Sequence, residues 1–332
     1  MKVLLATNAR DPERATIKKI IDAFRVCPRL AASDFSFTER AEDAEIILFI
    51  EDWKYKNWLY ADVLRASPLI VQYPEKCFVY EWSDAVAGFL PGVYASLERR
   101  IDDRNRFRSG GYVGIYNPSV QAVYSPDPIE PPLLFSFRGS SSHEIRKKLY
   151  GARFLDDPSL SGKIRVTQTF GWFDHKSAEL QDYAEELRDS KFVLCPRGIG
   201  PSSHRLFEVL CAGRVPVILS DEWVPPPGPD WERAAIQIPE ADYERIPEIV
   251  RQHESDWQER RLLARKTWED WFDPKVLPLR ILEGIEDIRR TRPESHSERE
   301  LQKRWTSQAF LWSNGWTVPQ RAAAKLRRLV TR

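Results

Sequence analysis

The chain has 332 residues, 42% of them hydrophobic, and a formal net charge of +1 at pH 7. This length suggests two domains of ordinary size, and the balanced charge gives no electrostatic reason to expect a nucleic-acid partner. The N-terminal apolar stretch is too short for a signal peptide, and the longest apolar run, of about seven residues, is far below a membrane span. The four cysteines stand among apolar neighbours without a CxxC pair, which favours buried thiols in a reducing compartment. We therefore expect a cytoplasmic protein.

The first third of the chain alternates strand patterns with helix patterns. Short, nearly continuous apolar runs are typical of parallel strands buried on both faces, whereas apolar residues spaced three and four apart are typical of helices. The predicted strands are 2–6, 45–50, 69–71 and 77–80, and the predicted helices are 17–24 and 59–64. This alternation indicates an α/β layer.

A proline-rich segment, PSVQAVYSPDPIEPP over 118–132, follows this layer. Because proline continues neither a helix nor a central strand, we take the segment as a linker and expect a first domain over 1–131. The alternation then restarts, and Ser141 and Glu144 have the spacing of a capping box. The predicted strands are 133–137, 164–166, 192–194, 215–219 and 235–238, and the predicted helices are 180–187 and several within 256–290. We expect a second α/β domain over 132–290 and a helical tail over 291–332 that could pack back on the first domain.

One loop of the second domain has the pattern of an anion site. In FVLCPRGIGPSSHRLFEVLCAGRVPVILS, 192–220, an apolar strand ends at a loop that contains Arg197 and two glycines. A helical pattern begins near Ser202 and ends at Gly213. Open α/β sheets bind ligands in such loops, at the carboxyl ends of strands. Free amides and the helix dipole favour an anion there, and an arginine adds a bidentate fork for phosphate. The alternative is a tight structural turn.

Other residues extend this pattern. Glu208 lies further along the predicted helix, where it could accept hydrogen bonds from ribose hydroxyls; the alternative is a surface ion pair with Arg205. His204 lies on the same helix face as Glu208, and it is otherwise a solvated or packed histidine. Arg138 and Gly139 form a second arginine–glycine pair at the end of another predicted strand. Their alternative is a surface turn.

At this point the residues carry a family resemblance. The block FVLCPRGIGPSSHRLFEVLCAGRVPVILSDEW, 192–223, resembles the signature of exostosin-like glycosyltransferases. LLFSFRGS, 133–140, resembles the strand and loop that open the nucleotide-binding half of that family, and AEDAEIILFI, 41–50, resembles its N-terminal domain more weakly. The strong resemblance covers 133–239, about a third of the chain.

The resemblance implies a GT-B architecture, in which two Rossmann-like α/β domains face a central cleft. It also implies inverting transfer of a sugar from a nucleotide donor, usually a UDP-sugar, to a hydroxyl of a glycan or lipid-linked glycan during polysaccharide or glycan biosynthesis. No cofactor and no metal site are implied. Animal and plant members are Golgi proteins with a membrane span and a stem; neither is expected here, which suggests a compact microbial or viral version in the cytoplasm.

The same resemblance assigns the donor site. Arg138, Arg197 and the loop 202–205 would hold the diphosphate, and Glu208 would hold the ribose. The implied donor-binding residues are Arg138, Gly139, Arg197, Gly198, Ser202, Ser203, His204, Arg205 and Glu208.

An inverting transfer also needs a general base and cations that stabilise the departing diphosphate. We expect Arg197 to act as such a cation and the base to follow a strand of the first domain. Glu51 and Asp52 follow one predicted strand, and Glu81 and Asp84 follow another. We prefer Asp84, then Glu81, because YEWSDAVAGFLPG, 80–92, surrounds Asp84 with glycine and aromatic residues suited to sugar. Its alternative is a turn or helix-cap aspartate, and Trp82 could stack on a sugar or belong to the core.

The C-terminus is basic and amphipathic. It could contact an anionic membrane that carries a lipid-linked acceptor, or it could be a solvated helix. Its basic residues are Arg321, Lys325, Arg327, Arg328 and Arg332. As an alternative function, the chain could be a non-catalytic nucleotide-sugar or glycan-binding module with a decayed active site. The intact Arg197, Ser202, Ser203 and Glu208 argue against that alternative.

Overall fold

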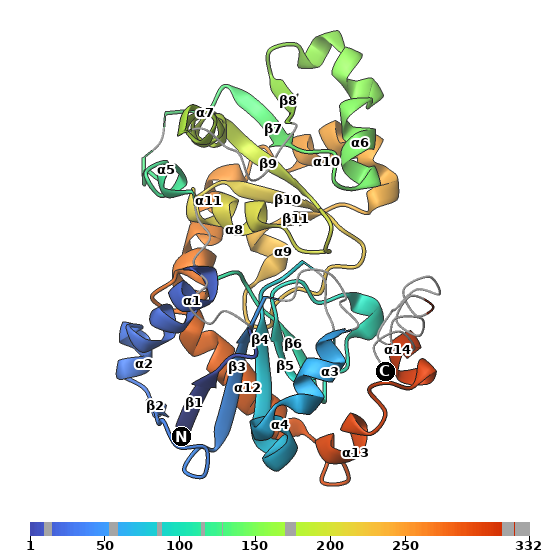
Figure 1. The fold of residues 1–332 in the computed structure, drawn as a ribbon. Helices are drawn as coiled ribbons and strands as arrows, with labels where there is room; N and C mark the ends of the chain where they lie inside the picture. The colour runs from blue at the N-terminus through green and yellow to red at the C-terminus, as the bar shows by residue number, and fades with distance from the viewer. Residues whose placement is uncertain are drawn as a thin grey trace. The chain divides into compact units, whose positions relative to one another are not determined.

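The computed structural model describes residues 1–9, 15–52, 59–84, 88–113, 117–127, 129–169, 177–313 and 322. It divides into two compact units. The first comprises Met1–Gly114 and Pro274–Arg332, and the second comprises Ile115–Asp273. Each unit is built on a parallel sheet of its own, flanked by helices (Figure 1). The chain therefore leaves the first unit, forms the second, and returns to complete the first.

The first unit contains a six-stranded sheet in the order β2-β1-β3-β4-β5-β6, and all its neighbouring strands run parallel. In Figure 1, α12 passes behind these strands, whereas α3 and α4 lie in front of them. The strands are β1 Lys2–Ala6, β2 Ser36–Phe37, β3 Ile46–Glu51, β4 Cys77–Glu81, β5 Gly92–Tyr94 and β6 Phe107–Ser109. The helices are α1 Ala15–Arg25, α2 Pro28–Ala31, α3 Leu59–Ala66, α4 Pro68–Gln72, α12 Leu277–Thr291, α13 Glu298–Gln302 and α14 Gln308–Ser313, with short 3₁₀ turns η1 Pro74–Lys76 and η2 Arg99–Ile101.

Helix α12 packs directly on strands β5 and β6 of this sheet. A Cβ atom on Gly284 would lie 3.2 Å from Cγ2 of Val93, so the absence of a side chain lets the helix approach the strand closely. Arg108 of β6 donates from Nη2 to Oδ2 of Asp287 at 2.8 Å. These contacts attach the returning segment to the first unit.

The second unit contains a five-stranded parallel sheet in the order β11-β10-β9-β7-β8. Its strands are β7 Leu133–Gly139, β8 Ile164–Gln168, β9 Ser190–Pro196, β10 Val215–Leu219 and β11 Ile236–Gln237. Its helices are α5 Pro118–Gln121, α6 Glu144–Tyr150, α7 Ser177–Arg188, α8 His204–Cys211, α9 Trp231–Ala234, α10 Ile246–Gln252 and α11 Trp257–Thr267, with short turns η3 Arg153–Asp156, η4 Pro158–Leu160, η5 Glu240–Arg245 and η6 Trp268–Phe272. The chain builds outward from β7 to β8 and then, through β9, in the opposite direction. That reversal makes the β7–β9 boundary the switch point of the sheet.

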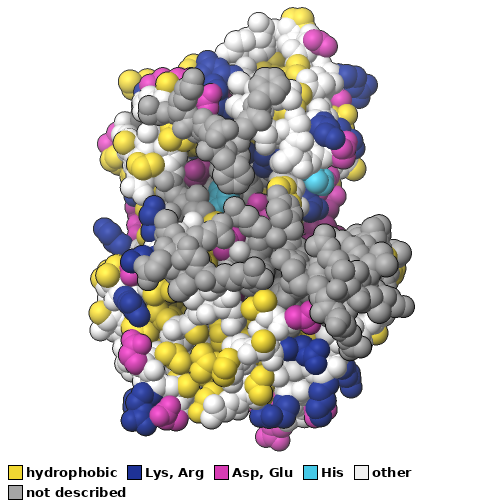
Figure 2. Space-filling view, in the orientation of Figure 1, with side chains coloured by type: hydrophobic (Ala, Val, Ile, Leu, Met, Phe, Trp, Pro, Cys, Tyr) yellow, Lys and Arg dark blue, Asp and Glu magenta, His cyan; other side chains and the backbone are white. Residues whose placement is uncertain are grey.

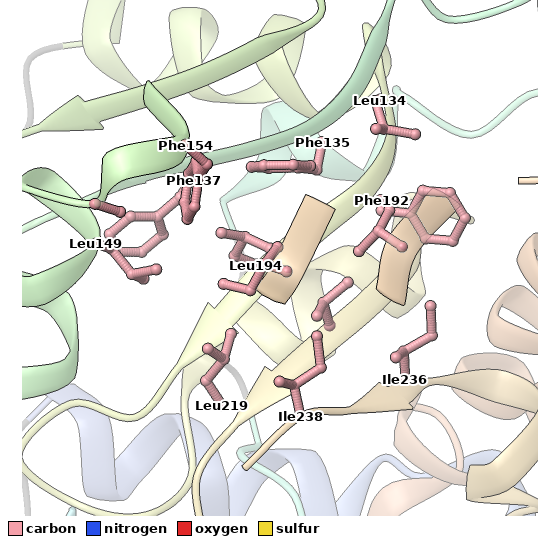
Figure 3. Packing of buried hydrophobic residues seen from close by; sticks show 14 of the residues in the cluster. Leu134, Phe135, Phe137, Leu149, Phe154, Phe192, Leu194, Leu219, Ile236 and Ile238 are labelled. Carbon is pink, nitrogen blue, oxygen red and sulfur yellow. The ribbon is translucent and has the colours of Figure 1, made fainter. Parts of the chain in front are cut away.

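Alternate residues of the central strands form the core of the second unit (Figure 3). Phe192 and Leu194 of β9 lie in one cluster with Phe135 and Phe137 of β7 and with the apolar face of α6 and α10. Burying side chains of this size contributes about 1.5–3 kcal/mol each to stability. The core thereby holds the two switch-point strands in register.

The α/β fold with two Rossmann-like domains is confirmed, and so is the strand assignment at most positions. The prediction of a strand over 69–71 is wrong, because those residues belong to α4. Pro68 occupies the first helical turn, where its missing amide is tolerated, and the amide of Tyr73 donates to the carbonyl of Leu69 at 2.8 Å. The capping box is also wrong: α6 begins at Glu144, and its N-cap is His143, whose Nδ1 accepts from the amide of Ile145 at 3.3 Å.

The compact units divide at 114/115 and 273/274, whereas the sequence indicated boundaries at 131/132 and 290/291. The proline-rich segment belongs to the second unit because α5 packs on α7 and α8, and because Arg261 of α11 donates to the carbonyls of Ser125 and Pro126. Helix α12 belongs to the first unit through its contacts with β5 and β6.

The tail beyond α12 packs on the first unit. Trp305 meets Phe89 edge-on with ring centroids 5.6 Å apart, and Phe310 stacks on Phe89 at 5.8 Å. The basic residues expected to contact a membrane lie outside the described residues. Among the residues that are described, no helix is long and apolar enough to cross a membrane. The four cysteines are free and buried, as predicted, and Figure 2 shows basic and acidic side chains interspersed over the surface it draws, in keeping with the net charge.

A buried ion cluster secures this tail. Glu298, the first residue of α13, is 1% exposed and accepts from Nε and Nη2 of Arg106 at 3.3 and 3.2 Å. Nε2 of His296 lies 2.7 Å from the same carboxylate, and Arg292 lies 3.6 Å away. Glu75 accepts from the amides of Glu298 and Arg299 at the start of α13. Burial by itself would raise the pKa of Glu298, but Arg106, His296 and Arg292 together hold that pKa below its ordinary value.

We predict that Glu298→Gln lowers the free energy of unfolding of the protein by up to about 3–5 kcal/mol at pH 7.5, because it leaves the buried Arg106 uncompensated. A carboxyl whose folded pKa is depressed stabilises the fold above its unfolded pKa, and it loses that contribution as the pH falls through the folded value. The difference between wild type and variant should therefore shrink below about pH 4.5. Urea unfolding at several pH values measures it.

Glu300→Gln is the matched control, since Glu300 lies on the same helix and its ion pair with Lys303 is exposed. This variant should be nearly as stable as wild type. Equal stability of the Glu298 and Glu300 variants at pH 7.5 would show that the cluster does not secure the tail.

Candidate functional site

The carboxyl ends of β7 and β9 bring the two predicted arginine–glycine pairs to the same edge of the second sheet. Strand β7 ends with Arg138 and Gly139, and β9 ends at Pro196, directly before Arg197. The amide of Arg197 donates to the carbonyl of Leu219 at 3.0 Å, which continues the sheet into the loop. Ligands of open α/β sheets bind outside the carboxyl ends of the strands at such a switch point.

Helix α8 begins at this edge, as predicted. Its N-cap is Ser203, in an extended conformation and without a side-chain hydrogen bond to the first turn. The amides of the first turn therefore keep their capacity to bind an anion. The helix ends at Cys211 and Gly213 follows it with a φ of +59°, as predicted for a glycine stop.

Arg205 lies in the first turn of α8 and is 2% exposed. Its guanidinium stacks over the ring of Phe137, 4.8 Å from the centroid, and donates to the carbonyl of Arg138. A Cβ atom on Gly139 would lie 2.9 Å from Nη2 of Arg205, so a larger residue here would displace the end of that guanidinium. The aromatic face and the carbonyl hold the cation without neutralising it.

Glu208 is buried in the same helix, with 4% exposure. It accepts a hydrogen bond from the phenol of Tyr183 at 2.9 Å, and burial together with this carboxylate raises the pKa of Tyr183 well above its ordinary value. The alternative of a surface pair with Arg205 is excluded by this burial. Every residue of α8 from Arg205 to Cys211 is buried, so Glu208 does not lie on a solvated face of the helix.

Arg138 does not lie in a free surface turn. Its Nε donates to Oε2 of Glu186 at 3.1 Å, and Glu186 is 2% exposed. Burial raises the pKa of Glu186, and the positive charge of Arg138 opposes that rise. Arg138 is therefore engaged with a carboxylate of α7, in contrast to Arg197 and Arg205.

Three polar atoms at this edge are inaccessible to solvent and have no hydrogen-bond partner within the part of the chain that the structure describes. They are Nε of Arg197, Nε of Arg205 and Oγ of Ser220. Buried polar groups of a native protein are normally satisfied. All three belong to the loop, strand end or helix start at this edge, where each has a hydrogen available to donate.

The charges at this edge are predominantly positive. Among the described residues named so far, Arg138, Arg197 and Arg205 are balanced by Glu186 and Glu208, and Arg146 of α6 adds a further cation that is 6% exposed. This positive charge affects His143, whose pKa is lowered by its burial and by the nearby charge of Arg197. Of the remaining predicted residues, Gly198, Ser202, Ser203 and His204 lie in the loop and helix start; Ser202 is buried and the others are partly exposed.

Sequence reasoning missed four residues of this edge. Tyr183 and Glu186 are three apart on α7, so the helical pattern of 177–188 could have placed them on one face. Ser220 directly follows the strand β10. Arg146 lies within the apolar face of α6, and a cation at such a position is itself a signal, because buried arginines bind polar partners.

The candidate bases lie at the carboxyl edge of the first sheet, described here by itself. Glu51 and Glu81 are register partners at the ends of β3 and β4, and both are buried. Glu51 accepts from the amide and the side chain of Asn8, and Glu81 accepts from Oγ of Ser83 at 2.6 Å. The switch point of this sheet is the β1–β3 boundary, where Glu51 lies.

Asp84 is partly exposed and accepts from the phenol of Tyr112 at 3.0 Å. Trp82 is partly exposed as well, so it is not a fully enclosed core residue. Of the two carboxylates that we singled out as bases, Asp84 is thus the accessible one and Glu81 is enclosed. The described residues of the chain offer no group of three His, Cys, Asp or Glu side chains placed to hold a metal ion.

Residues 111–253 match the family model described as the Exostosin GT47 domain. This part of the chain is similar to the exostosin glycosyltransferase domain. The matched range includes the switch point between β7 and β9, the arginine loop and α8. The resemblance seen in the sequence motif is thereby confirmed, and the exostosin domain coincides with most of the second unit.

Curated relatives match over part of the chain. An Exostosin-1 homolog of Caenorhabditis elegans is 40% identical over 79 residues, which are 23% of this chain and 21% of the worm protein. Exostosin-2 of Homo sapiens is 32% identical over 112 residues, which are 32% of this chain and 15% of the human protein. The chain thus spans about a fifth or less of the length of these relatives.

Solved structures also resemble the chain at low identity. A glycosyltransferase from Rickettsia africae ESF-5 is 9% identical with a TM-score of 0.39, covering 89% of this chain and 99% of the other. Anabaena Alr3699/HepE in complex with UDP and glucose is 11% identical with a TM-score of 0.39, covering 86% of this chain and 99% of the other.

We predict that Tyr183→Phe lowers the free energy of unfolding by about 1.5–3 kcal/mol, because it removes a hydrogen bond to a buried charged acceptor. Urea unfolding at pH 7.5 measures the change. Tyr243→Phe is the control, since that ring is partly exposed and lies beside Lys148 at the surface. If both variants unfold like wild type, the buried bond between Tyr183 and Glu208 contributes nothing to stability.

Proposed function

We propose that this protein transfers a sugar from a nucleotide donor, a UDP-sugar, to a hydroxyl of a glycan, with inversion at the anomeric carbon. The observation that supports this best is the set of three buried polar atoms, on Arg197, Arg205 and Ser220, that find no hydrogen-bond partner among the described residues. These groups donate hydrogen bonds and two of them are cationic, so they fit a diphosphate. The exostosin domain over the same residues supports the choice of reaction.

In this proposal Arg197, Arg205 and the first-turn amides of α8 hold the diphosphate, together with Gly198 and the loop residues Ser202, Ser203 and His204. Arg138 acts more weakly, because Glu186 already balances its charge. Glu208 holds the ribose, and its bond to Tyr183 fixes the orientation of the carboxylate. The cations supply the charge that a divalent metal would otherwise supply, so transfer proceeds without a metal.

The chemical step follows from these roles. A carboxylate of the first unit, Asp84 or Glu81, removes the proton of the acceptor hydroxyl. That oxygen then bonds to the anomeric carbon from the face opposite the leaving group, and the bond from this carbon to the diphosphate oxygen breaks. The nucleoside diphosphate leaves with an added negative charge, which Arg197, directly after β9, stabilises in this proposal.

The acceptor is a glycan or a lipid-linked glycan in this proposal. The cytoplasmic location and a membrane contact through the basic C-terminus stay predictions. Both are independent of the donor site, so binding of the nucleotide can be tested by itself.

We predict that UDP binds the wild-type protein in excess EDTA with an affinity close to that in Mg²⁺, because arginines and helix amides neutralise the diphosphate. Titration calorimetry in both buffers measures it. Uridine and pyrophosphate should each bind more weakly than UDP, since each contacts only part of the site. Binding of UDP in Mg²⁺ but not in EDTA would contradict the metal-independent mechanism and would still support a nucleotide site.

We predict that Arg197→Ala lowers kcat about 10²–10³-fold with a smaller change in KM, by analogy with the loss of one preorganised donor to a developing negative charge. Arg197→Lys should restore activity only in part, because an ammonium lacks the planar fork. The donor is a UDP-sugar that raises the melting temperature of the wild type. The rate of UDP release from this donor, by transfer to an acceptor or by slow hydrolysis, gives kcat and KM.

Arg245→Ala is the control, because Arg245 belongs to the same unit and its pair with Glu248 is exposed. A raised KM with unchanged kcat would assign Arg197 to ground-state binding alone. Absence of any sugar release by the wild type, despite UDP binding, would favour the non-catalytic binding module.

A further inference from the structure

Arg146 of α6 is a buried cation that joins the two loops of the switch point. Its Nε donates to the carbonyl of Arg197 at 2.9 Å, and its Nη2 donates to the carbonyl of Pro196 at 3.1 Å. Its Nη1 lies 3.5 Å from the carbonyl of Ser140, in the loop that follows β7. One guanidinium thus connects the end of β9 with the end of β7, and 6% of the residue is exposed.

These bonds set the direction of the next amide. In a planar trans peptide the carbonyl of one residue and the amide of the following residue point in opposite directions. Because the carbonyl of Arg197 points at Arg146, the amide of Gly198 points away from it. No acceptor for this amide is found within the described part of the chain. The preceding peptide obeys the same rule: the carbonyl of Pro196 accepts from Arg146, and the amide of Arg197 donates to Leu219.

The glycine at 198 suits this arrangement. A Cβ atom there would lie 3.2 Å from Nη2 of Arg146 and 3.5 Å from Oγ of Ser142, closer to the guanidinium than most side chains come. A larger residue would press on the guanidinium of Arg146, which would have to move by a few tenths of an ångström. Arginine suits position 146 better than lysine does. The guanidinium can donate to several carbonyls at once from fixed directions, whereas the ammonium of a lysine is a single point charge.

We propose that Arg146 is a positioning residue for the diphosphate site: by holding the carbonyls of Pro196 and Arg197, it turns the amide of Gly198 and the side chain of Arg197 toward the bound anion. This inference rests on the proposed function, since it assumes that the anion is the diphosphate of the donor. Arg146 itself acts through the loop, because its donors are directed at backbone carbonyls.

The test compares UDP with uridine, which shares the nucleoside and lacks the diphosphate. Titration calorimetry in EDTA gives both affinities for wild type, Arg146→Met and Arg146→Lys. We expect Arg146→Met to weaken UDP binding about 10–100-fold, as for the loss of hydrogen bonds to a charged group, while uridine binding stays within about twofold. Arg146→Lys should keep the charge but recover only part of the UDP affinity.

Lys147→Met is the matched control on the same helix, because Lys147 is exposed and bonds only Glu144 among the contacts shown; it should bind both ligands like wild type. Equal losses of UDP and uridine affinity in Arg146→Met, or no loss of either, would overturn the inference by assigning Arg146 a purely structural role. If Arg146→Met does not fold, full UDP affinity in Arg146→Lys overturns the inference and a selective loss of UDP affinity supports it. Failure of the wild type to bind UDP at all would instead overturn the proposed function.

Discussion

The reversal of strand order between β7 and β9 is the constraint on which the candidate site depends. All strands of the second sheet run parallel, so their carboxyl ends meet at one edge. Helices cover the faces of the sheet, but at the reversal the connections of β7 and β9 lead away in opposite directions and leave that edge open. The residues that end these two strands, Arg138 with Gly139 and Pro196 before Arg197, therefore become neighbours. The topology thus brings arginines of separate loops to one edge of the sheet.

Concentrating cations at one edge creates repulsion, which the fold offsets in three different ways. Arg138 is paired with a buried carboxylate, Arg205 lies against an aromatic face, and Arg146 donates to backbone carbonyls. Only the first of these cancels a charge; the others solvate a cation while preserving its field. These contacts form without an anion, so the proposed diphosphate would bind with little reorganisation of the site.

The first unit repeats the topology with the opposite chemistry. The carboxyl edge of its sheet ends in the acidic residues Glu51 and Glu81, which are register partners and are held by Asn8 and Ser83. Parallel sheets of the same strand order thus present cations in one unit and carboxylates in the other. A transferase that stabilises a departing diphosphate and removes an acceptor proton requires these two chemistries. The buried ion cluster around Glu298 attaches the C-terminal segment to the first unit, which carries these carboxylates.

The sequence by itself determined the local elements and the loop chemistry. The apolar run of β9, the glycines and arginine after it, and the helical spacing up to Gly213 depend only on residues close in the chain, so their pattern predicted strand, loop and helix correctly. The tertiary structure alone decided which residues from distant parts of the chain contact these elements. Leu69 to Val71 became helical because Pro68 and local hydrogen bonds favour a turn there. The partners Tyr183, Glu186 and Arg146 join the site from separate helices, and α12 returns to the first sheet. Such pairings depend on strand order and packing between distant segments, which no local periodicity records.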